Sequence, residues 1–208
     1  MIRRDALLLG LSAAFALSVP AWALDRALTP EEQQLIADIG THNSAIRTMV
    51  GRFLQIDTNG GRTEGTFFLE RPDKIAFRYA PPSREEIVSI GRGFYVLNRR
   101  DETYYAYPQD SIPLRQFLGD KIDLLNANVV DVTTSDGYIS ITVIDETVAG
   151  TVQVSLIFDT DTKELAQWSL VEPSGAELTF SLYDVEKDVE IPRAFFSIPA
   201  TYTAMEQP

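Results

Sequence analysis

The chain has no cysteine, a single histidine and no apolar run of membrane-spanning length. The lack of cysteine excludes disulfides and thiol nucleophiles. Bacterial lipoproteins are acylated on a cysteine just after the signal sequence, so we expect that this chain is not itself lipid-anchored. A triad based on histidine would depend on His42 alone, and nucleophile-elbow, zinc-protease and P-loop motifs are also missing. We therefore expect no enzyme, no metal site and no cofactor.

Positive charge is also scarce. The chain has 18 Lys and Arg against 30 Asp and Glu, a net charge of −12. Such a surface repels nucleic acid and anionic lipid surfaces, and a basic partner surface suits it better.

The first 23 residues have the pattern of a secretory signal peptide. A basic start at Arg3 and Arg4 precedes the apolar run 6–19, and Ala21-Trp22-Ala23 is an A-x-A cleavage signal. The arginine pair also fits a twin-arginine signal, although an ordinary basic n-region is the simpler interpretation. We expect residues 1–23 to be removed after export, which leaves one domain at 24–208.

The rest of the chain predicts one helix and then a mainly β structure. Thr29, Pro30 and Glu32 are typical of a helix start, and the apolar spacing predicts a helix over about 30–46. Period-two alternation and turn signals then predict antiparallel strands. The predicted strands are Met49–Asp57, Glu64–Glu70, Lys74–Tyr79, Glu86–Ile90, Phe94–Asn98, Thr103–Tyr107, Val129–Thr133, Gly137–Asp145, Thr151–Asp159, Leu165–Val171, Glu177–Val185 and Phe195–Ile198.

A second helical segment interrupts the strands. Residues 111–126 carry one apolar stripe, which Gly119-Asp120 can break into two short helices. The pattern as a whole predicts a large curved antiparallel sheet with a few helices over one face.

Apolar side chains occupy both faces of the segment "RTEGTFFLERPDKIAFRYAPP" at Arg62–Pro82. Two interpretations stay open. Either helices pack on the sheet and all of this surface is core, or a cavity between sheet and helices holds a lipid or an apolar peptide. A separate candidate for function is the series of alternating acidic residues at 184–190, since paired carboxylates can hydrolyse glycosides. Like charges near a strand end are, however, more typical of a solvated edge.

Several segments resemble the periplasmic outer-membrane lipoprotein carrier family, LolA. They are "MVGRFLQ", "TEGTFFLERPDKIAFRYAPP" with "EIVSIGRGFYVLN", and "VSLIFDTDTKELAQWSLVEPSGAELTFSLYDVE". The resemblance implies an incomplete antiparallel β-barrel, a half-barrel of about 11 strands, with helices covering the open side as a lid. It also implies a periplasmic carrier that takes acylated lipoproteins from an inner-membrane ABC transporter and hands them to an outer-membrane receptor lipoprotein.

The resemblance also assigns roles to residues. The family's arginine of Arg-Pro, which latches the lid by hydrogen bonds, corresponds to Arg71, although a surface ion pair with Glu70 or Asp101 is the simpler alternative. Ile90, Ile75 and Phe77 depart from the residues that are common in the family. We expect the acyl cavity to be formed by Phe53, Phe68, Ile75, Phe77, Tyr79, Leu114, Phe117 and Leu118.

The sequence leaves other functions open. The half-barrel also suits a lipid- or peptide-sensing periplasmic domain, and a soluble chain could share the receptor's delivery activity. A carboxylate-based envelope hydrolase is the remaining alternative. We expect a soluble monomer with acylated lipoproteins as cargo, and no nucleic-acid partner.

Overall fold

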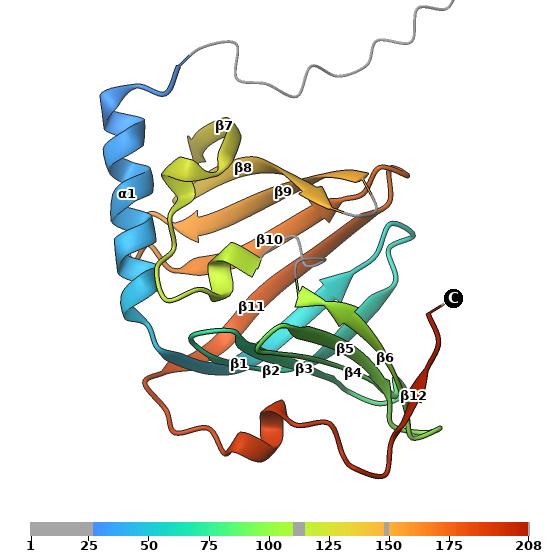
Figure 1. Cartoon of the computed structure of the whole chain (residues 1–208). Coiled ribbons are helices and arrows are strands. Elements are labelled where there is room, and N and C mark those ends of the chain that lie inside the picture. The colour runs from blue at the N-terminus through green and yellow to red at the C-terminus, as the bar shows by residue number, and fades with distance from the viewer. Residues whose placement is uncertain (1–26, 110–114, 148–149, 208) are drawn as a thin grey trace, which may run out of the picture.

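The computed structural model describes residues 27–109, 115–147 and 150–207, and most of them belong to one strongly curved β-sheet (Figure 1). The described helices are α1 (Pro30–Ala45) and the 3-10 helices η2 (Arg115–Leu118), η3 (Leu124–Asn126) and η4 (Arg193–Phe196). The strands are β1 (Thr48–Ile56), β2 (Arg62–Glu70), β3 (Lys74–Tyr79), β4 (Glu85–Ile90), β5 (Gly93–Asn98), β6 (Thr103–Pro108), β7 (Asn128–Ser135), β8 (Tyr138–Thr147), β9 (Gly150–Asp159), β10 (Leu165–Val171), β11 (Glu177–Lys187) and β12 (Thr203–Met205). Among these described helices, none is long and apolar enough to cross a membrane.

The strand order is β12-β6-β5-β4-β3-β2-β1-β11-β10-β9-β8-β7. Every pair is antiparallel except β12 with β6, and within the described residues the end strands β7 and β12 do not pair, so the sheet stays open. This confirms the expected mainly antiparallel, unclosed sheet. In Figure 1 the sheet bends between β1 and β11, so that an upper half (β7–β11) stands over a lower half (β1–β6 with β12).

Eleven of the predicted strands are present with ends shifted by only a few residues. The twelfth prediction, at Phe195–Ile198, is wrong because that segment contains the 3-10 helix η4, whose residue Phe196 is buried. The real twelfth strand, β12, was not predicted.

Helix α1 begins where the capping pattern predicted. The side chain of Thr29 accepts a hydrogen bond from the Glu32 amide (3.2 Å), and the Glu32 carboxylate accepts one from the Thr29 amide (2.8 Å). The helix buries Ile36 and Ile39 in a core cluster with the inner face of the upper half-sheet. Strand β9 supplies Val152, Val154, Leu156 and Phe158 to that cluster.

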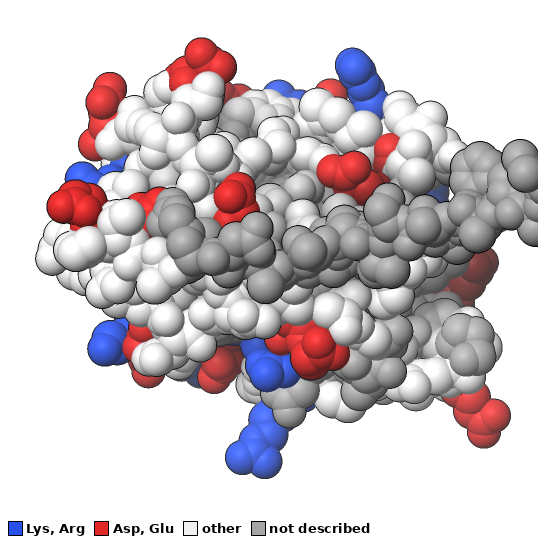
Figure 2. Space-filling view, turned by 90° about the horizontal axis from the view of Figure 1, so that it is seen from above, with Lys and Arg blue, Asp and Glu red and all other residues white. Residues whose placement is uncertain are grey.

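The outer face of the upper half is polar. In β9 the exposed or half-buried residues Thr151, Gln153 and Ser155 alternate with the buried ones, which confirms a sheet with one wet face. Figure 2, seen from above, shows acidic side chains spread over the molecule, with most Lys and Arg side chains near its outline.

The lower half-sheet, in contrast, is apolar on both faces. Phe67 of β2 points to the inner face, whereas Phe68 packs on the outer face against Phe195, with ring centroids 4.3 Å apart. Residues 189–202 after β11 run along this outer face, where Phe196 completes a buried cluster. The two-sided bulk of β2 therefore fills two separate apolar clusters.

The predicted helix over 111–126 is replaced in the described residues by two 3-10 turns. η2 and η3 are separated at 119–123, which includes the predicted break at Gly119-Asp120. Phe117, Leu118, Ile122 and Leu124 are buried against the inner side of the sheet.

Candidate functional site

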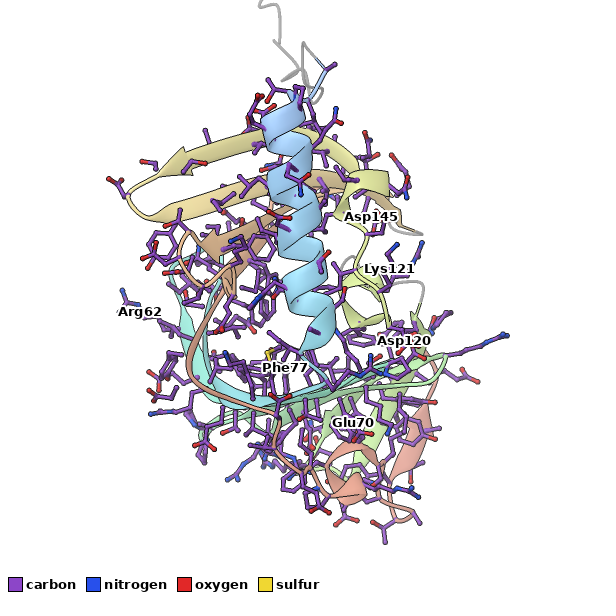
Figure 3. The ribbon with its side chains drawn as sticks, turned by 90° about the vertical axis from the view of Figure 1, so that its left-hand side faces the viewer. Arg62, Glu70, Phe77, Asp120, Lys121 and Asp145 are labelled. Carbon is purple, nitrogen blue, oxygen red and sulfur yellow. The ribbon has the colours of Figure 1, made fainter. Side chains whose placement is uncertain are left out.

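An apolar cavity of about 230 Å³ lies between the two half-sheets. It takes residues from β1 to β5, from β9 to β11 and from η2. Figure 3 shows Phe77 on the inner side of the lower half-sheet. Sixteen of the described residues line it, all of them apolar: Met49, Phe67, Leu69, Ile75, Phe77, Ile87, Phe94, Phe117, Leu118, Val154, Leu165, Trp168, Leu170, Leu178, Phe180 and Leu182.

Aromatic rings form much of the cavity wall. Trp168 and Phe180 stack with centroids 4.7 Å apart and an interplanar angle of 8°. Phe77 meets Trp168 edge-on at 5.9 Å and Phe53 at 5.3 Å. Such ring pairs are worth about 0.5–1.5 kcal/mol beyond the burial of their area, so they keep the wall in one arrangement.

Phe53 can lie behind this wall because residue 65 is a glycine. A Cβ added at Gly65 would stand 2.5 Å from the Phe53 ring and 2.3 Å from the carbonyl oxygen of Arg78. Tyr79 packs edge-on against the same ring at 5.1 Å and donates a hydrogen bond from its hydroxyl to the side chain of Gln55.

α1 and residues 115–126 form one hydrogen-bonded unit, which we call the cover. The Ser44 hydroxyl accepts a hydrogen bond from the Ile122 amide (2.8 Å), and Arg47 pairs with Asp120 at 2.8 Å. At Gly40 an added Cβ would stand 2.7 Å from the Ile122 carbonyl oxygen, so a larger residue would push the two segments apart. Figure 3 shows Asp120 and Lys121 beside the C-terminal end of α1.

Arg71 joins the cover to the lower half-sheet. Its guanidinium donates to the Ile46 carbonyl at the end of α1 (2.9 Å) and to the Phe117 carbonyl in η2 (3.0 Å). The guanidinium carbon also lies 5.2 Å from the centroid of the Phe117 ring. A backbone bond from the Asp73 amide to the Leu118 carbonyl (3.0 Å) adds a second link nearby.

The stability of this junction depends on a balance between favourable and unfavourable effects. Arg71 is only 4% exposed, and within the described part of the chain its Nε has no hydrogen-bond partner. Burial, reinforced by the charge of Arg47, lowers the pKa of Arg71 to about 10, so the group still carries its charge at neutral pH. Two charge-assisted bonds favour the closed junction, while the buried charge and the unpaired Nε oppose it. The junction is therefore easier to open than its bonds alone suggest.

The simpler alternative for Arg71 does not hold. Glu70 pairs with Lys74 at 2.5 Å, and Asp101 accepts a hydrogen bond from the Asn98 side chain. Arg71 lies inside the molecule with its donors on backbone carbonyls, not in a surface ion pair.

The structure separates the residues that were expected to line a cavity. Ile75, Phe77, Phe117 and Leu118 lie in the cavity wall. Phe53 and Tyr79 belong to the core cluster behind that wall and are absent from the lining. Leu114 lies outside the described residues.

Phe68 does not fit its expected place. Register pairs it with Ala76 of β3, and both side chains belong to the outer cluster under residues 189–202. Because successive side chains in a strand point to opposite faces, Phe67 rather than Phe68 faces the cavity. We therefore leave Phe68 out of the candidate site.

The upper half-sheet contributes lining residues that sequence reasoning missed, among them Trp168, Leu170, Phe180 and Leu182. These apolar positions recur at alternate places along β10 and β11, which marks one buried face of each strand. That pattern alone does not reveal that the apolar face of β10 and β11 lies across the cavity from β3.

Burial also distinguishes Tyr79 from the other tyrosines near the site. Desolvation, with a contribution from Glu85, raises the pKa of its phenol well above the usual value, so it is a neutral hydrogen-bond donor. Its hydroxyl bonds the Gln55 side chain behind the cavity wall, and the phenol does not transfer protons at neutral pH.

Polar chemistry is sparse around the cavity. The carboxylates at 184, 186, 188 and 190 are exposed, as expected for a solvated strand end. No group of three or more His, Cys, Asp or Glu is placed to hold a metal ion in the part of the chain that the structure describes. The site can therefore offer apolar contact beneath a cover that Arg71 joins to the lower half-sheet.

The family model "Outer membrane lipoprotein carrier protein LolA" matches residues 44–199 of the chain. No curated protein matches the chain in sequence.

Solved structures share the fold at low sequence identity. A conserved protein from Thermus thermophilus, described as uncharacterized, superposes with a TM-score of 0.50 at 6% identity, over 84% of this chain and 98% of the other. A LolA superfamily protein from Nitrosomonas europaea gives a TM-score of 0.43 at 11% identity, over 82% and 98%. The Pseudomonas aeruginosa MucA/MucB complex gives 0.44 at 12%, over 82% and 62%.

Proposed function

Because the chain belongs to the outer membrane lipoprotein carrier protein LolA family, we propose that it carries lipoproteins across the periplasm with their acyl chains bound in the apolar cavity. The observation that carries this proposal is the cavity itself, in which the sixteen lining residues that the structure describes are all apolar. A catalytic or metal-dependent site needs polar groups that converge on a reacting atom, and the described part of this lining offers none.

The free-energy cost of exposing acyl chains to water explains why a carrier is needed. Exposing an acyl chain costs about 0.8 kcal/mol per methylene, so a chain of roughly fifteen methylenes costs on the order of 12 kcal/mol in water. A lipoprotein carries more than one such chain. Its transfer between membranes therefore requires an apolar surface that travels with it.

The cavity must enlarge to accept that cargo. Its volume of about 230 Å³ is below the range of roughly 300–1,000 Å³ typical of small-molecule sites. The bonds described above between the cover and the lower half-sheet are two from Arg71, to the Ile46 and Phe117 carbonyls, and one from the Asp73 amide to the Leu118 carbonyl. We propose that the cover is the lid, that Arg71 is its latch, and that cargo binds when these bonds break.

The proposed route begins at an inner-membrane ABC transporter and ends at an outer-membrane receptor lipoprotein. Residues 1–23 would direct export as a signal peptide, and the exported chain has no cysteine to acylate. The acidic surface, with a net charge of −12 over the whole chain, favours basic docking surfaces on both partners.

A quenching experiment tests binding at the cavity. In the chain from residue 24 onward Trp168 is the only tryptophan, and it lies in the cavity wall. Stearic acid that carries a nitroxide on its chain should quench Trp168 emission and saturate, while a water-soluble nitroxide without the chain should not. Unsaturable quenching, or equal quenching by both compounds, would contradict acyl binding in this cavity.

A further inference from the structure

A second hollow of about 360 Å³ lies at the opposite end of the strands from α1 and is lined by Pro81, Arg84, Arg99 and Arg100. The turn between β3 and β4 supplies two of these residues, and the turn between β5 and β6 supplies the other two. These turns lie on the right of Figure 1, away from α1. Three arginines thus gather in one place on a chain whose net charge is −12.

The backbone holds one of the three arginines in position. The Arg99 guanidinium donates to the carbonyl of Tyr79 (2.6 Å) and more weakly to that of Ser83 (3.4 Å). The Arg99 amide also bonds the Arg84 carbonyl at 2.8 Å, which ties the two turns together.

The side chains of the other two arginines are exposed. Within the described ranges, neither Arg84 nor Arg100 forms an ion pair, whereas Arg47, Arg52 and Arg78 do. The neighbouring carboxylate of Asp101, a ready partner by sequence, instead accepts a hydrogen bond from Asn98. The positive charge of the hollow is therefore left for a ligand.

Guanidinium groups match the geometry of phosphate oxygens, because each presents several N–H donors in a planar fork. Repulsion among three neighbouring cations also falls when an anion binds between them. The hollow is open at the surface, so the anion need not lose all of its hydration.

A chain of packed side chains connects the arginine hollow to the wall of the apolar cavity. Arg99 holds the backbone of Tyr79, whose ring packs on Phe53, and Phe53 in turn packs on Phe77 of the cavity wall. These packed side chains fill the space between the two regions, and the hollow and the cavity share no lining residue among those described.

From these observations we propose that Arg84, Arg99 and Arg100 form a phosphate-binding site, which accepts the phosphate of a single lipid headgroup or free inorganic phosphate. The overall acidic charge opposes binding to an anionic membrane surface and leaves a single phosphate as the ligand. The site is separate from the proposed acyl-binding activity, and its existence does not depend on that activity.

The test uses the exported chain and two ligands, inorganic phosphate and dihexanoyl phosphatidylglycerol below its micelle concentration. Affinities are measured by NMR titration of the backbone amides of residues 84, 99 and 100. The variant Arg84→Gln/Arg100→Gln removes the two unpaired charges and keeps Arg99, which holds the turns. Arg92→Gln is the matched control, because Arg92 is also exposed but lies in the β4–β5 turn outside the hollow.

The double variant should bind either ligand at least about tenfold more weakly, since it loses charge-assisted hydrogen bonds, while Arg92→Gln should match the wild type. Tighter binding of the phospholipid than of phosphate assigns the site to headgroups, and equal binding assigns it to free phosphate. The proposal is overturned if neither ligand shifts these amides, or if the double variant binds like the wild type. Nitroxide quenching of Trp168 in the same samples reports the acyl cavity separately, so either activity can fail without the other.

Discussion

Replacement of Arg71 by leucine should make the protein hold acyl chains more tightly and release them more slowly. The two bonds from Arg71 to Ile46 and Phe117 exist when the cover is closed over the small cavity. A closed, empty state that is stabilised in this way competes with the cargo-bound state. Without the bonds the closed state loses stability, so the balance shifts towards retention of cargo.

The structure sets the size of this effect. Each charge-assisted hydrogen bond contributes about 1.5–3 kcal/mol, and an unsatisfied buried donor such as the Arg71 Nε costs about 1–3 kcal/mol. Two such bonds less the unpaired Nε leave about 2.5 kcal/mol at the middle of these ranges. With the further cost of the buried charge, we take the net contribution as about 1–3 kcal/mol, equivalent to a change in affinity of roughly 5- to 150-fold. We expect Arg71→Leu to bind a fluorescent fatty-acyl probe more tightly within this range.

The assay compares probe affinity and the rate of cargo transfer to acceptor vesicles that carry the receptor. Arg71→Lys keeps the charge but lacks the planar fork, so it should lie between the wild type and Arg71→Leu. Arg92→Leu replaces an exposed arginine and should leave both quantities unchanged. Transfer at the wild-type rate by a folded Arg71→Leu protein would refute the latch.

Three further outcomes are expected. Phe77→Glu places a carboxylate in the apolar cavity wall and should lower acyl-probe affinity by tenfold or more, whereas Tyr138→Glu, at an exposed position, should not; circular dichroism checks that both fold. Phe196→Ala should lower the free energy of unfolding by about 3–5 kcal/mol without changing probe affinity in the folded protein, because Phe196 is buried on the outer face of the sheet. Tyr79→Phe should reduce the loss of stability above pH 10: the phenol of Tyr79 has a raised pKa in the folded state, so its stabilising contribution is complete below pH 10 and falls as the unfolded chain ionises first. Denaturant titrations of both proteins at pH 8 and pH 11 measure this difference, and equal losses would contradict it.

Local pattern predicted most of the fold because many of the strands alternate apolar and polar residues and are bounded by turn residues. Lys74–Tyr79 and Leu165–Val171 begin and end where the sequence predicted, and the capping box placed the start of α1. β12 could not be found in this way, since its three exposed residues gain their strand geometry only by pairing with β6. Phe195 and Phe196 suggested a strand, but both aromatic rings pack in the cluster on the outer face of the sheet, which adjacent residues of a regular strand cannot do.

The sequence predicted part of the cavity wall in the lower half-sheet but none of the wall in the upper half-sheet. Alternation along β3 put Ile75 and Phe77 on one face, and that face does line the cavity. Phe68 was misplaced because a family assignment outweighed its own strand phase, which puts it opposite Phe67. The contribution of Trp168 depends on how far the sheet curves between β1 and β11, which is a property of the whole sheet and not of any one strand.

A release assay tests directly whether the chain carries acylated lipoproteins. Inner-membrane vesicles that contain an acylated lipoprotein and the ABC transporter are incubated with ATP and the exported chain, and the supernatant is analysed for a carrier–lipoprotein complex. We expect that the wild-type chain brings the acylated lipoprotein into solution, that Phe77→Glu does not, and that a non-acylated form of the same lipoprotein forms no complex. Failure of the wild-type chain to release lipoprotein, or equal release by Phe77→Glu, would show that the chain does not carry lipoproteins through this cavity.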